Sequence, residues 1–210
     1  IQKSGAYGVW FKTAFGAIDS NTITENNANS NIDSTGLLIE GGSPTASNNT
    51  ISSNYYGLRV LSSSTSTISS NTFSSNTSFA AESNGAYPSF SGSTASGNGT
   101  NGIGLQGTVE QNYTLNADIP YVIQNITYTI DTGKTLTAAA GAIIKLQGGG
   151  TISANGKLVT NKGSFNYPLV VAAFGKLNKS DFQWIEKDGM NHLIYFADKN
   201  TIIIISSEAW

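Results

Sequence analysis

Short apolar and polar alternations, separated by Gly, Asn and Ser, recur along the first half of the chain. Four of them align as Asn or Ser, Thr, an apolar residue and a hydroxyl residue, namely Asn21–Thr24, Asn49–Ser52, Asn71–Ser74 and Ser93–Ser96. The steps are 28, 22 and 22 residues (49 minus 21, 71 minus 49, 93 minus 71). Since side chains alternate between the faces of a strand, Ile23, Ile51 and Phe73 are predicted to point inward and to stack from copy to copy. A fixed period of this kind indicates a repeat architecture.

A second segment precedes each copy and begins with glycine and an apolar alternation. Its copies are Gly8–Phe11, Gly36–Ile39, Gly57–Val60 and Gly102–Leu105, with Ala80 or Ala81 standing where a fourth copy should have glycine. The excess of six residues in the first step fits an extra loop between Asn26 and Thr35, which is rich in turn residues. No stretch has a helical period, so we expect coils of three short strands and three turns, roughly 22 residues long.

Two columns of asparagine run through the repeat in the same register. The first contains Asn21, Asn49 and Asn71, and the second contains Asn26, Asn54, Asn76 and Asn98. A buried turn must satisfy its backbone donors and acceptors, and Asn side chains can do so while tolerating left-handed geometry. We therefore interpret both columns as structural ladders.

The glycine segment followed by Asn-Thr-Ile-Ser-x-x-Asn resembles the parallel β-helix repeat of pectate-lyase-like and NosD-like proteins, over residues 7 to about 110. The resemblance implies an all-β, right-handed parallel β-helix (solenoid). Residues 111–160 are similar to lead-in strands of bacterial and archaeal surface β-helix proteins, through Pro120–Ile123, Lys134–Thr137, Ala142–Leu146 and Gly156–Val159. They imply further β-helix, so coils are expected over 1–110 and continuing strands over 111–160.

Residues 161–210 are expected to be β-rich and to cap the solenoid or to contact another subunit. The run Thr201, Ile202, Ile203, Ile204 and Ile205 lacks alternation, so both of its faces must be covered. One interpretation is that it completes the last coil, and the other is strand donation to a neighbouring subunit.

Composition narrows the class of protein. Only 11% of the 210 residues are charged, the net charge is −2 and Cys is absent. No cluster of Lys and Arg suggests nucleic-acid binding, and no run is apolar enough for membrane insertion. We expect an extracellular or cell-surface location. The candidate N-glycosylation sequons lie at Asn48, Asn76, Asn98, Asn112, Asn125 and Asn178.

No catalytic constellation emerges from the sequence. Moving Asp19 along the repeat gives serines, so carboxylates do not stack into a calcium cage. Lys12 maps onto Glu40, which indicates an ordinary surface pair, and Arg59 is the one candidate for an arginine base, with Glu40 and Glu82 expected on flanking coils. We predict no catalytic residues, no cofactor and no metal.

The sequence therefore predicts a non-enzymatic structural module, either an adhesin stalk or an extracellular filament subunit. One alternative is a polysaccharide-active lyase or hydrolase, and a second is an ice-binding solenoid built on the outward Thr columns. Trp10, Phe11, Tyr55 and Tyr56 are candidates for carbohydrate contact. Since a bare solenoid end needs a cap, we expect end-to-end self-association or neighbouring β-helix segments, including sequence upstream of Ile1.

Overall fold

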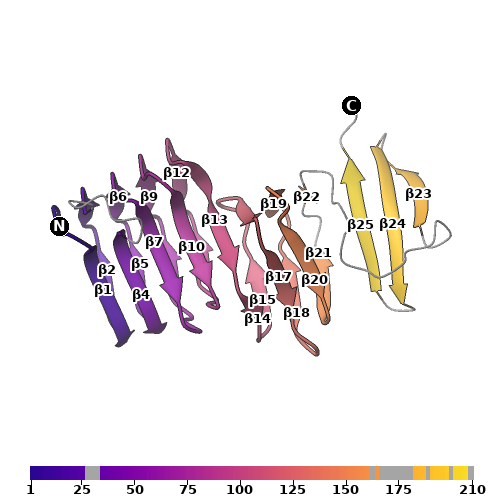
Figure 1. The fold of residues 1–210 in the computed structure, drawn as a ribbon, viewed down its shortest axis with the longest axis horizontal. Helices are drawn as coiled ribbons and strands as arrows, with labels where there is room; N and C mark the ends of the chain where they lie inside the picture. Colours follow the sequence, from indigo (N-terminus) through magenta and orange to yellow (C-terminus); the bar gives the residue numbers. More distant parts are fainter. Residues whose placement is uncertain (27–33, 161–163, 166–181, 188–189, 199–200, 208–210) are drawn as a thin grey trace.

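The computed structural model describes residues 1–26, 34–160, 164–165, 182–187, 190–198 and 201–207. These residues form strands and turns with no helix. The prediction of an all-β parallel solenoid is confirmed, because successive coils pair in parallel with a step of 22 residues, as between Thr50 and Thr72. The coils stack along the long axis of the molecule (Figure 1).

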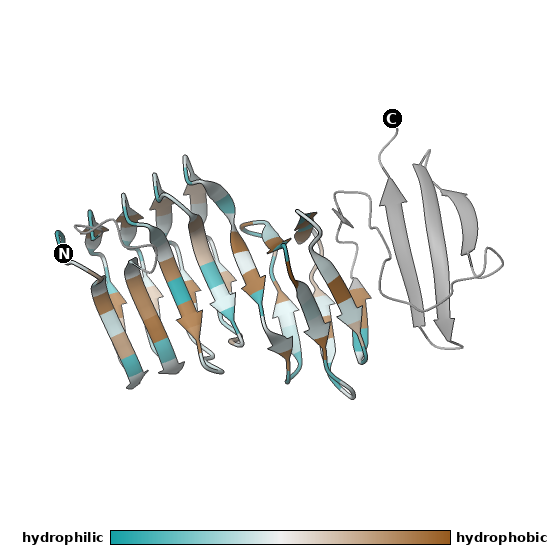
Figure 2. Ribbon diagram, in the orientation of Figure 1, coloured by the Kyte–Doolittle hydropathy of each residue, from teal (hydrophilic) through white to brown (hydrophobic). Residues whose placement is uncertain are grey.

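One side of every coil belongs to a sheet of eight parallel strands, here called the long sheet. In spatial order its strands are β1 (Tyr7–Ala14), β4 (Thr35–Gly42), β7 (Tyr56–Leu61), β10 (Phe79–Asn84), β13 (Thr100–Gln106), β16 (Tyr121–Gln124), β19 (Ile143–Gln147) and β22 (Ser164–Phe165). The glycine segments of the sequence lie in β1, β4, β7 and β13. Successive side chains of these strands point to opposite faces, which gives the sheet an inner and an outer face. The strands carry both hydrophobic and polar residues (Figure 2).

Two narrower sheets close the first coils. The second sheet contains β2 (Ala17–Asp19), β5 (Thr45–Ser47), β8 (Thr67–Ser69) and β11 (Ser89–Ser91), and the third contains β3 (Thr22–Thr24), β6 (Thr50–Ser52), β9 (Thr72–Ser74) and β12 (Thr94–Ser96). In the third sheet Ile23 pairs with Ile51 and Ile51 with Phe73, all fully buried. Each coil thus covers the apolar row of its neighbour, which is the main stabilisation of a solenoid.

The coil changes shape after β13. The next step in the long sheet, from Ile103 to Tyr121, is 18 residues (121 minus 103). The chain now lies over the second sheet, because the amide of Asn116 donates to the carbonyl of Phe90 in β11 at 2.8 Å, and the third sheet ends at β12. The later coils are closed by β14 (Thr108–Val109), β17 (Thr127–Ile130) and β20 (Thr151–Ala154), and by β15 (Tyr113–Leu115), β18 (Thr135–Ala138) and β21 (Lys157–Thr160).

The last three strands form a separate antiparallel sheet in the order β23 (Phe182–Lys187), β24 (Met190–Asp198) and β25 (Thr201–Ser207). The run Thr201 to Ile205 lies in β25 and pairs with β24. This antiparallel pairing differs from the parallel pairing of the coils. Contact of this strand with another subunit stays a prediction.

Candidate functional site

Each coil from β2 to β12 contains two consecutive five-residue units, of which the sequence analysis detected only the second. The unit consists of an outward residue, usually Thr, an inward apolar residue, an outward residue, usually Ser, a residue with positive φ, and Asn or Ser. The pairs are 17–21 and 22–26, 45–49 and 50–54, 67–71 and 72–76, and 89–93 and 94–98. The fourth residue is left-handed in all eight units, with φ between 53° and 64°.

The first asparagine column lies between the second and third sheets. The Oδ1 atoms of Asn49 and Asn71 accept hydrogen bonds at 2.9 Å from the backbone N–H of Asn21 and Asn49 respectively. The amide of Asn71 also donates to the carbonyl of Ala46, and Ser93 continues the column by accepting from the N–H of Asn71 at 3.2 Å. These contacts join each coil to the next through buried side chains.

The second column follows the third sheet and has the same geometry. Backbone N–H groups of Asn26, Asn54 and Asn76 donate to the Oδ1 atom of the next asparagine at 2.9–3.0 Å, ending at Asn98. Asn26, Asn54 and Asn76 are buried, and Asn101 terminates the column by accepting from Asn98. All seven asparagines of the proposed ladders therefore lie in two continuous hydrogen-bonded rows.

The ladder geometry corrects part of the glycosylation prediction. Asn76 is 1% exposed, and its amide donates to the carbonyl of Ile51 and to Asn98, so the folded chain has no room for a glycan there. Asn98 is tied by its own amide to the carbonyl of Phe73. Asn178 lies outside the described residues. Exposed sequon asparagines are Asn48, Asn112 and Asn125.

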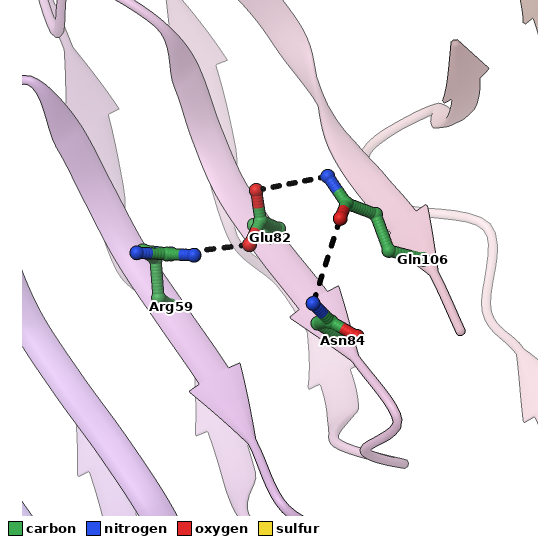
Figure 3. Close-up of polar contacts among 4 residues, drawn as sticks. All are labelled: Arg59, Glu82, Asn84 and Gln106. Atoms are coloured by element: carbon green, nitrogen blue, oxygen red, sulfur yellow. Dashed lines mark hydrogen bonds and ion pairs between the residues drawn. The ribbon is translucent and has the colours of Figure 1, made fainter. Parts of the chain in front are cut away.

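The outer face of the long sheet carries a polar group that we call the outer-face cluster: Arg59, Glu82, Asn84 and Gln106 (Figure 3). Arg59 Nε donates to Glu82 Oε1 at 3.1 Å, and Gln106 donates to Glu82 Oε2 at 3.3 Å. The amide of Asn84 lies 3.5 Å from Gln106 Oε1. These side chains come from β7, β10 and β13, and the parallel register places them on neighbouring coils.

Glu82 is the unusual member of the cluster, because it is 1% exposed although it points away from the core. The side chain of Phe79 lies over Gly104 beside it, where any Cβ atom would be 3.2 Å from the ring. The β10–β13 register shifts by one residue between Phe79 and Ala81, which adjusts the two strands to this packing. A buried carboxylate requires a paired charge, and Arg59, whose side chain is 19% exposed, supplies it.

Glu40 and Glu82 lie on the two coils that flank Arg59, as the sequence predicts. Arg59 pairs in register with Leu38 on one side and with Glu82 on the other, whereas Glu40 pairs with Leu61. Glu40 therefore lies on the same face of the sheet as Arg59 but two residues further along its strand. Lys12 and Glu40 stand opposite each other in the strand register of adjacent coils, as predicted.

Aromatic side chains flank the cluster toward the N-terminal coils. The Arg59 guanidinium lies 4.8 Å from the centre of the Tyr56 ring, which also packs edge-on against Tyr55 at 5.2 Å. Burial, and then the Glu82 carboxylate, raise the pKa of Tyr56. Trp10 is 47% exposed, with the Lys12 ammonium 5.0 Å from its ring centre. Phe11, a candidate for carbohydrate contact, instead packs against the core.

Asp19, at the N-terminal end of the second sheet, accepts hydrogen bonds from three polar side chains. Ser47 Oγ lies at 2.5 Å, Asn48 Nδ2 at 2.8 Å and Ser20 Oγ at 2.8 Å. These contacts lower the pKa of the Asp19 carboxyl, with Ser47 the largest cause. In the next two coils the position of Asp19 is occupied by Ser47 and Ser69, as the repeat in the sequence predicts.

Proton transfer by the outer-face cluster would face a geometric obstacle. A general acid or base must reach the substrate proton directly or through one water. Both Glu82 oxygens already accept hydrogen bonds, and the side chain is almost fully covered. Over the described residues, no group of three or more His, Cys, Asp or Glu gathers to hold a metal ion, and no helix is long and apolar enough to span a membrane.

Comparison with known proteins agrees with the architecture. A family model described as "Right handed beta helix region" matches residues 1–119, which covers the coils from β1 to β15. No curated protein and no solved structure matches the chain. The matched part is more than half of the 210 residues and contains both asparagine ladders. The chain belongs to the right-handed β-helix family.

Proposed function

We propose that the chain is a non-enzymatic structural module of a secreted or cell-surface protein, which holds its outer faces at fixed spacing on a rigid rod. The observation that carries this proposal is the pair of buried asparagine ladders, which join four consecutive coils by side-chain hydrogen bonds. Coils linked in this way cannot shift without leaving buried donors unpaired, which is costly. A rod of this kind suits an adhesin stalk or a filament subunit.

The surface chemistry supports the same proposal. Outward positions of the second and third sheets hold mainly Thr and Ser, and only 11% of all residues are charged. The most polar group on the long sheet, the outer-face cluster, uses its carboxylate to pair with Arg59. A side chain committed to a buried ion pair stabilises the local structure and is poorly available for proton exchange.

Two measurements test this proposal. Antibody labelling of intact cells of the source organism should detect the chain without permeabilisation. The purified chain, incubated with acidic and neutral polysaccharides, should release neither unsaturated sugars nor new reducing ends above the buffer rate. Turnover that is lost in Glu82→Gln, with the fold retained, would show that the chain is an enzyme.

A second candidate function is glycan recognition on the outer face of the long sheet. It is favoured by exposed Trp10 and by a row of amides, in which Gln124 pairs in register with Gln147 beyond Gln106. Flat aromatic rings and planar amides at fixed spacing suit sugar rings and their hydroxyl groups. Binding to immobilised glycans should fall in Trp10→Ala and Gln124→Ala, and should be unchanged in Thr50→Ala on the third sheet. Equal binding by all three variants would exclude this face.

A further inference from the structure

The N-terminal end of the solenoid has one of its three strand positions already covered. Residues 1–4 lie along β3, where Gln2 forms a parallel bridge with Thr24 and the Thr24 N–H donates to the carbonyl of Ile1 at 2.9 Å. By contrast, β1 and β2 are the terminal strands of their sheets among the described residues. Figure 1 shows this end of the stack, where the N-terminus lies.

Residues 1–4 occupy the register of a complete coil. Gln2 pairs with Thr24, a step of 22 residues (24 minus 2), which equals the step from Thr50 to Thr72. The Ser4 N–H donates to Asn26 Oδ1 at 3.1 Å, just as the Asn26 N–H donates to the next asparagine. The Asn26 amide donates to the carbonyl of Ile1 at 3.3 Å, the same contact that the next ladder amide makes to Ile23. These four residues therefore act as the last strand of a coil.

The uncovered part of this end is apolar. Val9 and Phe11 are only partly buried, whereas their partners in the next coil, Leu37 and Ile39, are fully buried. Phe15, in the turn between β1 and β2, is 82% exposed. Apolar rings and an open eight-residue strand at one end of a sheet form a surface that pairs readily with another strand.

We propose that this end is a stacking face for one further parallel coil of the same repeat, joined in register to residues 1–4. The chain passes through each coil in the order long sheet, second sheet, third sheet, as β1, β2 and β3 do. Eighteen residues (22 minus 4) leading into Ile1 would therefore fill the positions over β1 and β2. A second copy fits less well, because residues 1–4 occupy the position over β3 that its own coil would need.

The incoming coil has defined chemistry. It places apolar residues over Val9 and Ile18, and its residue in the first ladder column donates a backbone N–H to Asn21, as Asn21 donates to Asn49. Opposite Gly8 it requires glycine, for the same reason that Gly8 is required opposite Gly36. A Cβ atom on Gly8 would lie 2.6 Å from the Gly36 carbonyl oxygen, and the incoming residue meets the Gly8 carbonyl in the same way. These requirements follow from the fold and do not depend on the proposed function.

Duplicating a coil of the chain itself tests this inference. Residues 33–50, placed directly before Ile1, supply eighteen residues that set Gly36 over Gly8 and Asn49 over Asn21. The control carries residues 33–49, so the whole extension slips by one residue and its inward side chains turn outward. The extended proteins are compared with the unextended chain by thermal melting and by hydrogen exchange of the β1 amides.

We expect the eighteen-residue extension to raise Tm by about 5 °C or more and to slow exchange in β1 at least about tenfold, while the slipped control leaves both unchanged. Equal effects of the two extensions, or no effect of either, would overturn the proposal. An extension that does not fold leaves β1 exchange unchanged and counts against it. Concentration-dependent dimers of the unextended chain that protect β1 equally would show that the face takes a second copy.

Discussion

Replacing Asn54 with alanine removes one complete rung of the second asparagine ladder. Its Oδ1 accepts from the N–H of Asn26 at 2.9 Å, and its Nδ2 donates to the carbonyl of Ile23 at 3.2 Å. Both backbone groups are buried, and alanine leaves each without this partner. The defect therefore lies between two coils rather than within one.

The expected loss of stability can be estimated from these two hydrogen bonds. A buried donor or acceptor left unsatisfied costs about 1–3 kcal/mol, so the two groups together cost about 4 kcal/mol. For a chain of this size each kcal/mol shifts Tm by about 2–4 °C, which predicts a fall of roughly 10 °C. Thermal unfolding followed by circular dichroism measures it, and the far-ultraviolet spectrum before heating checks that the variant is folded.

The first ladder column offers a matched control. The amide of Asn21 donates only to the exposed carbonyl of Asp19 in the described structure, and its backbone N–H bond to Asn49 survives mutation. Asn21→Ala should therefore shift Tm by no more than about 3 °C. If Asn54→Ala melts within that range, or if both variants fall equally, the ladders do not hold the coils together as argued.

Three further predictions concern other parts of the chain. Gly57→Ala should lower the urea midpoint severely, since its Cβ would lie 2.3 Å from a carbonyl oxygen, whereas Gly85→Ala, at φ +55° with open space around it, should cost only about 1 kcal/mol. Arg59→Ala should cost about 3 kcal/mol in urea unfolding, because Glu82 would stay buried without its partner; a loss below 1 kcal/mol would refute the pairing argument. Burial raises the pKa of Tyr121 above its usual 10.0, so the unfolded chain loses that proton first and the free energy of unfolding should fall as pH rises above about 10; a flat profile up to pH 11 would contradict this.

The period and the inward column were predictable from the sequence because both are properties of residue spacing. Ile23, Ile51 and Phe73 lie at equal positions in aligned strands, so alternation alone sends them into the core. The first five-residue unit of each coil was missed because its inward column, Ile18, Ala46, Ile68 and Phe90, varies in size and its first copy begins with Ala17. Its left-handed fourth position gives little signal in the sequence, because it holds Ser20, Asn48, Ser70 and Gly92, and serine does not by itself indicate a positive φ.

The outer-face cluster was only partly predictable. Arg59 and Glu82 can be placed on neighbouring coils from the repeat. Which residue of β10 lies opposite Arg59 was not predictable, because β10 lacks the glycine that aligns the other copies. The burial of Glu82 depends on Phe79 lying over Gly104, and that contact follows a shift in strand register. Tertiary packing of this kind leaves no signal in residue spacing.

The two kinds of surface in this solenoid point to different roles. On the second and third sheets three of the five positions in each unit, the inward residue, the left-handed residue and the ladder residue, serve the stacking of coils. On the long sheet the matching outward position changes from coil to coil, through Trp10, Leu38, Arg59, Glu82, Gly104, Val122 and Lys145. Stacking does not require that variation, since the inward residues of the same strands already bury the core. The outer face of the long sheet is therefore the surface whose side chains are least constrained by stacking, and a search for partners should begin there.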